Sequence, residues 1–206
     1  ALYDAVASAI GVTPNLEGAV IQGDRLRLFH RGSGRGFGLN RTVKVAYALD
    51  SGATGPVLSV DRHDLGTAGE VPYSFTDAVA LDAERVLYLA VAEDTPNAID
   101  DGPIVGASLG VLGTTGGRWA PILEADGQPS VRKFEGVALA PDGRSGYLIT
   151  DADNPDLPAE LVKVTIEGLG GPSGQPAQIA VAAAAATAGS EARLALEYWG
   201  LPPRKL

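Results

Sequence analysis

Three stretches of the chain follow one sequence template, and this recurrence constrains the fold more than any other feature. Each stretch contains a carboxylate, a short apolar strand, a tight turn, a second apolar strand and a charged loop. The leading carboxylates are Glu17, Asp77 and Glu135, which lie 60 and 58 residues apart. A nearly fixed period of this size is typical of a repeat architecture.

Two further strands are predicted in each unit from runs rich in Val, Ile, Leu and Tyr that Gly, Asp and Pro turns separate. The third strands are predicted at 42–48, 104–112 and 161–166. The fourth strands are predicted at 57–61, 119–123 and 178–181. Four short strands per unit are typical of a propeller blade. We therefore predict an all-β fold made of β-propeller blades, with three four-stranded antiparallel repeats and short terminal helices.

The three blades are predicted at about 15–66, 75–124 and 133–182, within a β-propeller region at 15–182. Apolar residues at helical spacing predict a leading helix within residues 1–14. Residues 183–206 are predicted to be an alanine-rich tail that contains a short helix at 190–199.

Three blades are too few for a closed ring, because propellers typically contain about 4 to 8. An open set of blades leaves sheet edges exposed to pairing or aggregation. We therefore expect a larger ring, completed either by missing N-terminal blades or by a second copy of the chain.

The composition excludes several classes of partner. A formal charge of −9 argues against nucleic acid, because phosphate backbones bind clustered Lys and Arg. The longest apolar run, 179–188, is far shorter than the ~20 residues that cross a bilayer. Cysteine is absent, which excludes disulfides and thiolate metal sites. We expect a soluble protein without a membrane partner; its compartment stays open, with secreted and periplasmic locations among the alternatives.

The leading carboxylates are candidates for a metal site. The innermost strands of a propeller line its central channel, so Glu17, Asp77 and Glu135 are expected to meet at one channel mouth. Like charges at such distances raise one another's pKa unless a cation lies between them. Calcium accepts irregular cages of oxygen ligands, so we predict Ca²⁺ on these three residues. In the alternative, the carboxylates accept backbone N–H bonds at strand ends or pair with arginines.

A second group of polar residues follows the second strand of each unit. Its members are His30, Arg31, Glu93, Asp94, Asp151 and Asp153. These positions are expected to share one face of the disc, in loops, where binding groups are commonly carried. We predict that Glu93 and Asp94 are catalytic, with Glu93 as a general base, and that the other four bind a small polar ligand.

The openings of the three units also support a family resemblance. They read Asn-Leu-Glu-Gly-Ala at 15–19, Ser-Phe-Thr-Asp-Ala at 74–78 and Lys-Phe-Glu-Gly-Val at 133–137. In this order they resemble an uncharacterised family of bacterial β-propeller proteins. More distantly, they are similar to phytase-related esterase-like propellers and to calcium-dependent lactonase propellers. The resemblance implies a propeller fold, and the distant similarity implies a calcium site on the leading carboxylates.

The sequence thus leads to two hypotheses about function. In the first, a propeller binds a small polar ligand at its channel mouth and acts as a metal-dependent esterase or phosphoesterase. The cation would then polarise a carbonyl or phosphoryl oxygen and activate a water molecule. In the alternative, the propeller is a non-catalytic module for protein interaction or assembly.

Overall fold

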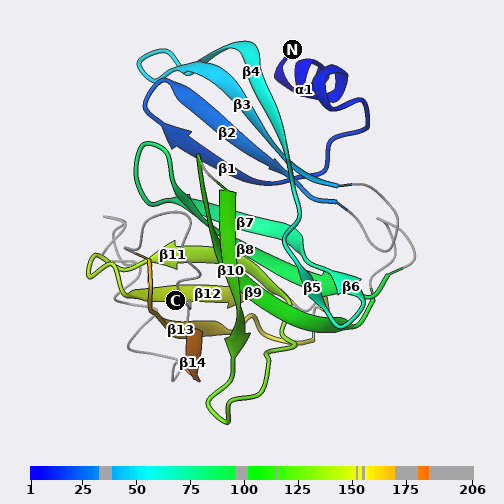
Figure 1. The fold of residues 1–206 in the computed structure, drawn as a ribbon, viewed down its shortest axis with the longest axis vertical. Helices are drawn as coiled ribbons and strands as arrows, with labels where there is room; N and C mark the ends of the chain where they lie inside the picture. The colour runs from blue at the N-terminus through cyan, green and yellow to red at the C-terminus, as the bar shows by residue number, and fades with distance from the viewer. Residues whose placement is uncertain are drawn as a thin grey trace.

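In the computed structural model of the 206-residue chain, the described residues are all-β apart from one short helix, which confirms the predicted all-β class (Figure 1). This helix, α1 (Leu2–Ile10), confirms the predicted leading helix. The structure describes residues 1–32, 39–95, 102–114, 116–151, 153–154 and 156–169, and the backbone of 181–185. The predicted helix at 190–199 lies outside these ranges. Within them, no helix is long and apolar enough to cross a lipid bilayer.

Within the described residues, three four-stranded antiparallel sheets follow one another along the chain. The first sheet has the order β1 (Leu16–Gln22), β2 (Arg25–His30), β3 (Asn40–Ala48) and β4 (Ala53–His63). The second has the order β7 (Ser74–Ala80), β8 (Val86–Glu93), β9 (Ile104–Gly113) and β10 (Gly116–Leu123). The third has the order β11 (Phe134–Leu139), β12 (Ser145–Thr150), β13 (Leu161–Ile166) and β14 (Val181–Ala185).

Two smaller features complete the topology. A short hairpin of β5 (Thr67–Ala68) and β6 (Val71–Pro72) lies between the first and second sheets in the sequence. At the outer edges, β14 runs parallel to β10 over two residue pairs, which joins the second and third sheets. The last strand was predicted to end at Val181, but it begins there. Its alanines carry a weak β signal, because alanine is depleted in strands.

The turns between the first two strands of each sheet use glycine or aspartate. Gly23 adopts a positive φ of 64° between β1 and β2, a conformation that glycine reaches without steric cost. Between β7 and β8, the carboxylate of Asp82 accepts hydrogen bonds from the backbone amides of Glu84 and Arg85. Asp142 accepts equivalent bonds in the turn between β11 and β12. These local signals explain why the hairpins were predictable.

Successive sheets pack face to face through alternating side chains of their second strands. In β2, Leu28 packs towards α1, whereas its neighbour Phe29 packs towards the second sheet. The Phe29 and Phe75 rings meet edge to face with centroids 5.2 Å apart, and Phe75 and Tyr88 do so at 5.3 Å. A second apolar cluster, which includes Leu89 of β8, fills the space between the second and third sheets.

The first strands of the three sheets lie next to one another. β7 contacts β1 on one side and β11 on the other, and the three strands cross the middle of the molecule (Figure 1). This arrangement brings the starts of β1, β7 and β11 close together. The predicted polar residues therefore gather from three sheets.

Candidate binding site at the strand bulges

Each of β1, β7 and β11 carries a β-bulge near its start, and the bulges decide which side chains are equivalent. The extra residue is Glu17 in β1, Thr76 in β7 and Glu135 in β11. The sequence template grouped Asp77 with the two glutamates, and this alignment is wrong by one residue. Asp77 instead follows the bulge and pairs with Leu89. A bulge inserts one residue into one strand of a pair, and sequence spacing alone does not show where.

Asp77 ties the second sheet to the third. Its Oδ2 accepts a hydrogen bond of 2.8 Å from the backbone amide of Val137, and its Oδ1 accepts one of 2.8 Å from the amide of Ala78. Burial raises the pKa of Asp77, and the two amide hydrogen bonds oppose this rise. Both carboxylate oxygens are thus engaged by backbone, in agreement with the alternative that the sequence left open.

Arg31 joins the first sheet to the second. Its Nη2 lies 2.6 Å from Oε2 of Glu93, and its Nη1 lies 3.9 Å from Oε1 of Glu17. The Arg31 side chain is 14% exposed and that of Glu93 is 9% exposed, so the pair is largely shielded from water. The second oxygen of Glu93 accepts a hydrogen bond of 2.9 Å from the amide of Gly102.

Glu135 is a carboxylate with a strongly raised pKa. Burial raises its pKa to about 7, Arg31 and Lys133 oppose the rise, and Glu17 and Glu93 add to it. These four charged residues therefore lie near enough to Glu135 to affect its pKa. Within the described part of the chain, Glu135 forms no salt bridge. Its protonation is expected to change near neutral pH.

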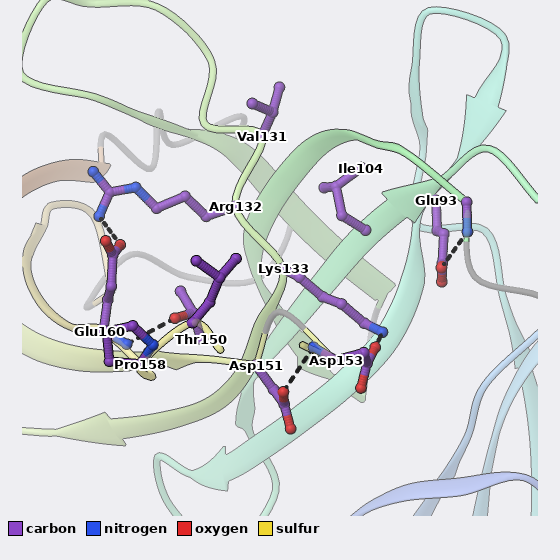
Figure 2. A pocket seen from close by; sticks show the side chains of 12 residues that line it. Glu93, Ile104, Val131, Arg132, Lys133, Thr150, Asp151, Asp153, Pro158 and Glu160 are labelled. Carbon is purple, nitrogen blue, oxygen red and sulfur yellow. Dashed lines mark hydrogen bonds and ion pairs between the residues drawn. The ribbon is translucent and has the colours of Figure 1, made fainter. Parts of the chain in front are cut away.

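A cavity of about 630 Å³ opens beside this cluster (Figure 2). Its charged lining residues are Glu93, Arg132, Lys133, Asp151, Asp153 and Glu160. Its apolar lining includes Ile104, Val131 and Leu157. An adjacent cavity of about 550 Å³ shares Asp151 and Asp153 with the first and reaches Glu135 and Ile149.

Most charges at the cavity have partners (Figure 2). Lys133 forms a salt bridge with Asp153. Arg132 contacts Glu160 at 3.0 Å and Glu124 at 3.1 Å. Oδ1 of Asp151 accepts a hydrogen bond of 2.9 Å from the amide of Asp153. The side chains are therefore held in place, as a binding site requires.

The structure separates the predicted site residues into two groups. Arg31, Glu93, Asp151 and Asp153 lie at or beside the cavity, as do two of the three predicted metal ligands. By contrast, His30 is buried, and its Nδ1 accepts a hydrogen bond of 3.0 Å from the amide of Asn15.

The roles of His30 and Asp94 differ from those of the cavity residues. Burial and, secondly, Arg41 lower the pKa of His30, which favours the neutral imidazole. Its observed contact orders the chain before β1. The backbone amide of Asp94 donates a hydrogen bond of 3.0 Å to the carbonyl oxygen of Pro103. Asp94 lines neither of the two cavities.

Sequence reasoning missed Arg132 and Lys133 as members of the site, and it missed Thr76 as the bulge residue of β7. Lys133 lies two residues before Glu135, in the Lys-Phe-Glu-Gly-Val segment. A search for charged residues next to each leading carboxylate would therefore have found it. Thr76 is 1% exposed, and its hydroxyl has no hydrogen-bond partner among the described residues. Only the register of the bulge reveals that Thr76 corresponds to the two glutamates.

The predicted calcium ligands do not fit a shared cation. Among the described residues, no group of three or more His, Asp or Glu side chains is placed to hold a metal ion. Asp77 directs both oxygens at backbone amides, and Glu17 faces Arg31. These contacts supply hydrogen-bond donors and a positive charge where a cation would have to lie. Calcium binding by this protein therefore stays a prediction, and no cluster of ligands among the described residues supports it.

Comparison with known proteins places the chain in a family. A model described as a family of unknown function, DUF6910, matches residues 1–155, so the protein belongs to this family. The matched region contains Arg31, Glu93, Lys133 and Glu135, and the cavity residues Asp151 and Asp153. No curated protein and no solved structure matches the chain.

Proposed function

We propose that the three sheets are blades of a β-propeller and that the cavity beside Glu135 binds a small polar ligand. One observation carries this proposal: charged side chains associated with all three sheets meet at or directly beside the cavity. Arg31 comes from the first sheet, Glu93 from the second, and Lys133 from the segment that enters the third. Convergent polar groups in a concave, partly apolar pocket are typical of ligand sites.

The lining also defines the kind of ligand. Four carboxylates line the larger cavity, against one arginine and one lysine. Both cations are already paired with acidic side chains. Ionised carboxylates only accept hydrogen bonds, so the cavity suits a ligand with hydroxyl or amine donors. A phosphate or carboxylate ligand would meet an excess of like charge.

Binding without chemistry agrees best with the state of Glu93. A general base needs a free oxygen within reach of the proton that it removes. Both oxygens of Glu93 are engaged, by Arg31 and by the amide of Gly102. Ester or phosphoester hydrolysis therefore stays a prediction, as does the alternative of a non-catalytic interaction propeller.

Thermal unfolding in the presence of defined compounds tests the proposal. The panel contains neutral sugars, polyols, polyamines, dicarboxylates, inorganic phosphate and calcium with and without EDTA. A sugar, polyol or amine is expected to raise the Tm of the wild type, because a ligand of the folded state stabilises it. Phosphate and dicarboxylates are expected to have no effect.

Matched variants locate the binding. Asp151→Asn removes a cavity carboxylate, whereas Asp50→Asn removes one from an exposed turn of the first sheet. The shift in Tm should disappear in the first variant and persist in the second. A panel without any hit, or a shift that Asp151→Asn leaves intact, would contradict the proposal. A calcium shift that Glu135→Gln abolishes would instead support the calcium prediction.

A further inference from the structure

The smaller cavity, of about 550 Å³, has acidic lining residues but no basic ones among the described residues. Its three carboxylates belong to Glu135, Asp151 and Asp153. The larger cavity differs, because Arg132 and Lys133 line it together with its acids. The smaller cavity therefore presents negative charge that no cation of its own described lining balances.

Two cations near the smaller cavity are already paired with other acids. Lys133 forms a salt bridge with Asp153, and Arg31 lies 2.6 Å from Glu93. Burial raises the pKa of Glu135 and both cations oppose this rise, so both lie near Glu135. Neither forms a salt bridge with it in the described part of the chain. A positively charged ligand group would therefore not displace an existing partner of Glu135.

Two carboxylates of the smaller cavity keep free acceptor oxygens. Oδ1 of Asp151 accepts a hydrogen bond of 2.9 Å from the backbone amide of Asp153, and its Oδ2 has no donor among the described residues (Figure 2). Within the same ranges, Glu135 accepts no hydrogen bond at either oxygen. Ionised carboxylates only accept hydrogen bonds, so these oxygens suit a ligand group with several N–H or O–H donors.

Exposed apolar side chains lie beside these carboxylates. Ile149 and Leu157 line the smaller cavity and are 46% and 56% exposed, and Val131 of the larger cavity is 61% exposed. Single exposed apolar residues are common on protein surfaces, but here three of them share two adjacent cavities. A carbon chain that lies on them would remove apolar surface from water. The cavity thus combines negative charge with an apolar wall.

We propose that the smaller cavity binds the primary ammonium group of an aliphatic amine, with its N–H groups on Glu135 and Asp151 and its carbon chain on Ile149 and Leu157. The amine is the ligand class of the site proposed above, and its assignment depends on that site. A neutral polyol has donors but no charge to balance the acids. A quaternary ammonium ion has no N–H donor and is commonly bound by aromatic side chains, none of which lines either cavity among the described residues.

Three probes with one carbon chain and different head groups test the assignment. They are butylamine, butanol and butyltrimethylammonium, each titrated calorimetrically into the full chain at constant ionic strength. At about pH 8 the amine is protonated, and Glu135, whose pKa is about 7, is mostly ionised. Butylamine is expected to bind at least about ten-fold more tightly than the other two, because charge-assisted hydrogen bonds are the stronger ones. Equal affinities for butylamine and butanol would overturn the proposal.

Matched variants locate the bound amine. Glu135→Gln and Asp151→Asn each remove one charge and keep the shape of the side chain. Each should weaken the binding of butylamine about ten-fold, whereas Asp50→Asn, in an exposed turn, should leave it unchanged. Asp151 is itself exposed, so its variant provides the test even if Glu135→Gln unfolds. Butylamine that binds the wild type and the carboxylate variants equally well would overturn the proposal.

The same measurements separate the amine from the site as such. A neutral sugar or polyol that raises the Tm of the wild type but not of Asp151→Asn, together with no binding of butylamine, would keep the site and overturn the amine. No binding by any of these compounds would overturn both.

Discussion

The carboxylate of Asp77 accepts a hydrogen bond of 2.8 Å from the backbone amide of Val137, 60 residues further along the chain. A single half-buried acid of β7 therefore holds the start of β11, the first strand of the third sheet, against β7. The same carboxylate also accepts a hydrogen bond of 2.8 Å from the backbone amide of Ala78. This contact explains why Asp77 belongs to the framework of the site and not to a shared metal centre.

Asp77→Ala is expected to destabilise the protein by about 1–3 kcal/mol, because it leaves two partly buried amides without acceptors. Urea unfolding measures the change. Asp50→Ala, in an exposed turn, is the control and should alter the free energy of unfolding by less than about 0.5 kcal/mol. An equal effect of the two substitutions would show that the bond to Val137 contributes nothing.

Arg31→Ala should cost about 3 kcal/mol, since it leaves the nearly buried carboxylate of Glu93 without its cation. The control is Arg25→Ala, which breaks a more exposed pair with Glu84 at 2.8 Å and should cost less than about 1 kcal/mol. The comparison is made by chemical denaturation at one pH. If the two arginines prove equivalent, the Arg31–Glu93 pair is not shielded from water in solution.

Glu135 should make stability depend on pH. Its pKa is about 7 in the folded protein, whereas in the unfolded chain it is the ordinary value near 4.5. The folded state thus holds this proton more tightly, so the free energy of unfolding falls as pH rises through that interval. Glu135→Gln removes this contribution.

Denaturation of the wild type and of Glu135→Gln between pH 4 and pH 8 measures the effect. The variant is expected to gain stability relative to the wild type as pH rises from about 4.5 to about 7, and to show a constant difference above that range. A difference that does not vary with pH would mean that Glu135 keeps an ordinary pKa.

Gly110→Ala should destabilise the second sheet by about 1–3 kcal/mol through overpacking. A Cβ atom at Gly110 would lie 2.2 Å from Cζ of Tyr88, whose ring is 1% exposed. The ring packs between the first and second sheets and has little room to move. In the background of Tyr88→Ala, the same glycine substitution should cost much less, as a double-mutant cycle would show. Additive costs would contradict this steric explanation.

The sequence by itself determined the β-strands, their antiparallel order and the turns. These features depend on local signals: apolar runs, Gly23 at a positive φ, and aspartates such as Asp82 and Asp142 that cap the turn amides. It also located most of the polar residues near the cavity, because the template placed them at the ends of strands. The signal was weak for β14, where alanine replaces the usual β-branched residues, and the two-residue strands β5 and β6 were not predicted.

Only the tertiary structure decided which of these residues act together. A bulge shifts the register by one residue, so Thr76 rather than Asp77 corresponds to Glu17 and Glu135. The pairing of Arg31 with Glu93 joins residues 62 positions apart, and the raised pKa of Glu135 arises from burial between sheets. The ion pair and the raised pKa depend on how separate sheets pack against one another. Local sequence patterns carry no information on the distance between two sheets or on how far their side chains are shielded from water.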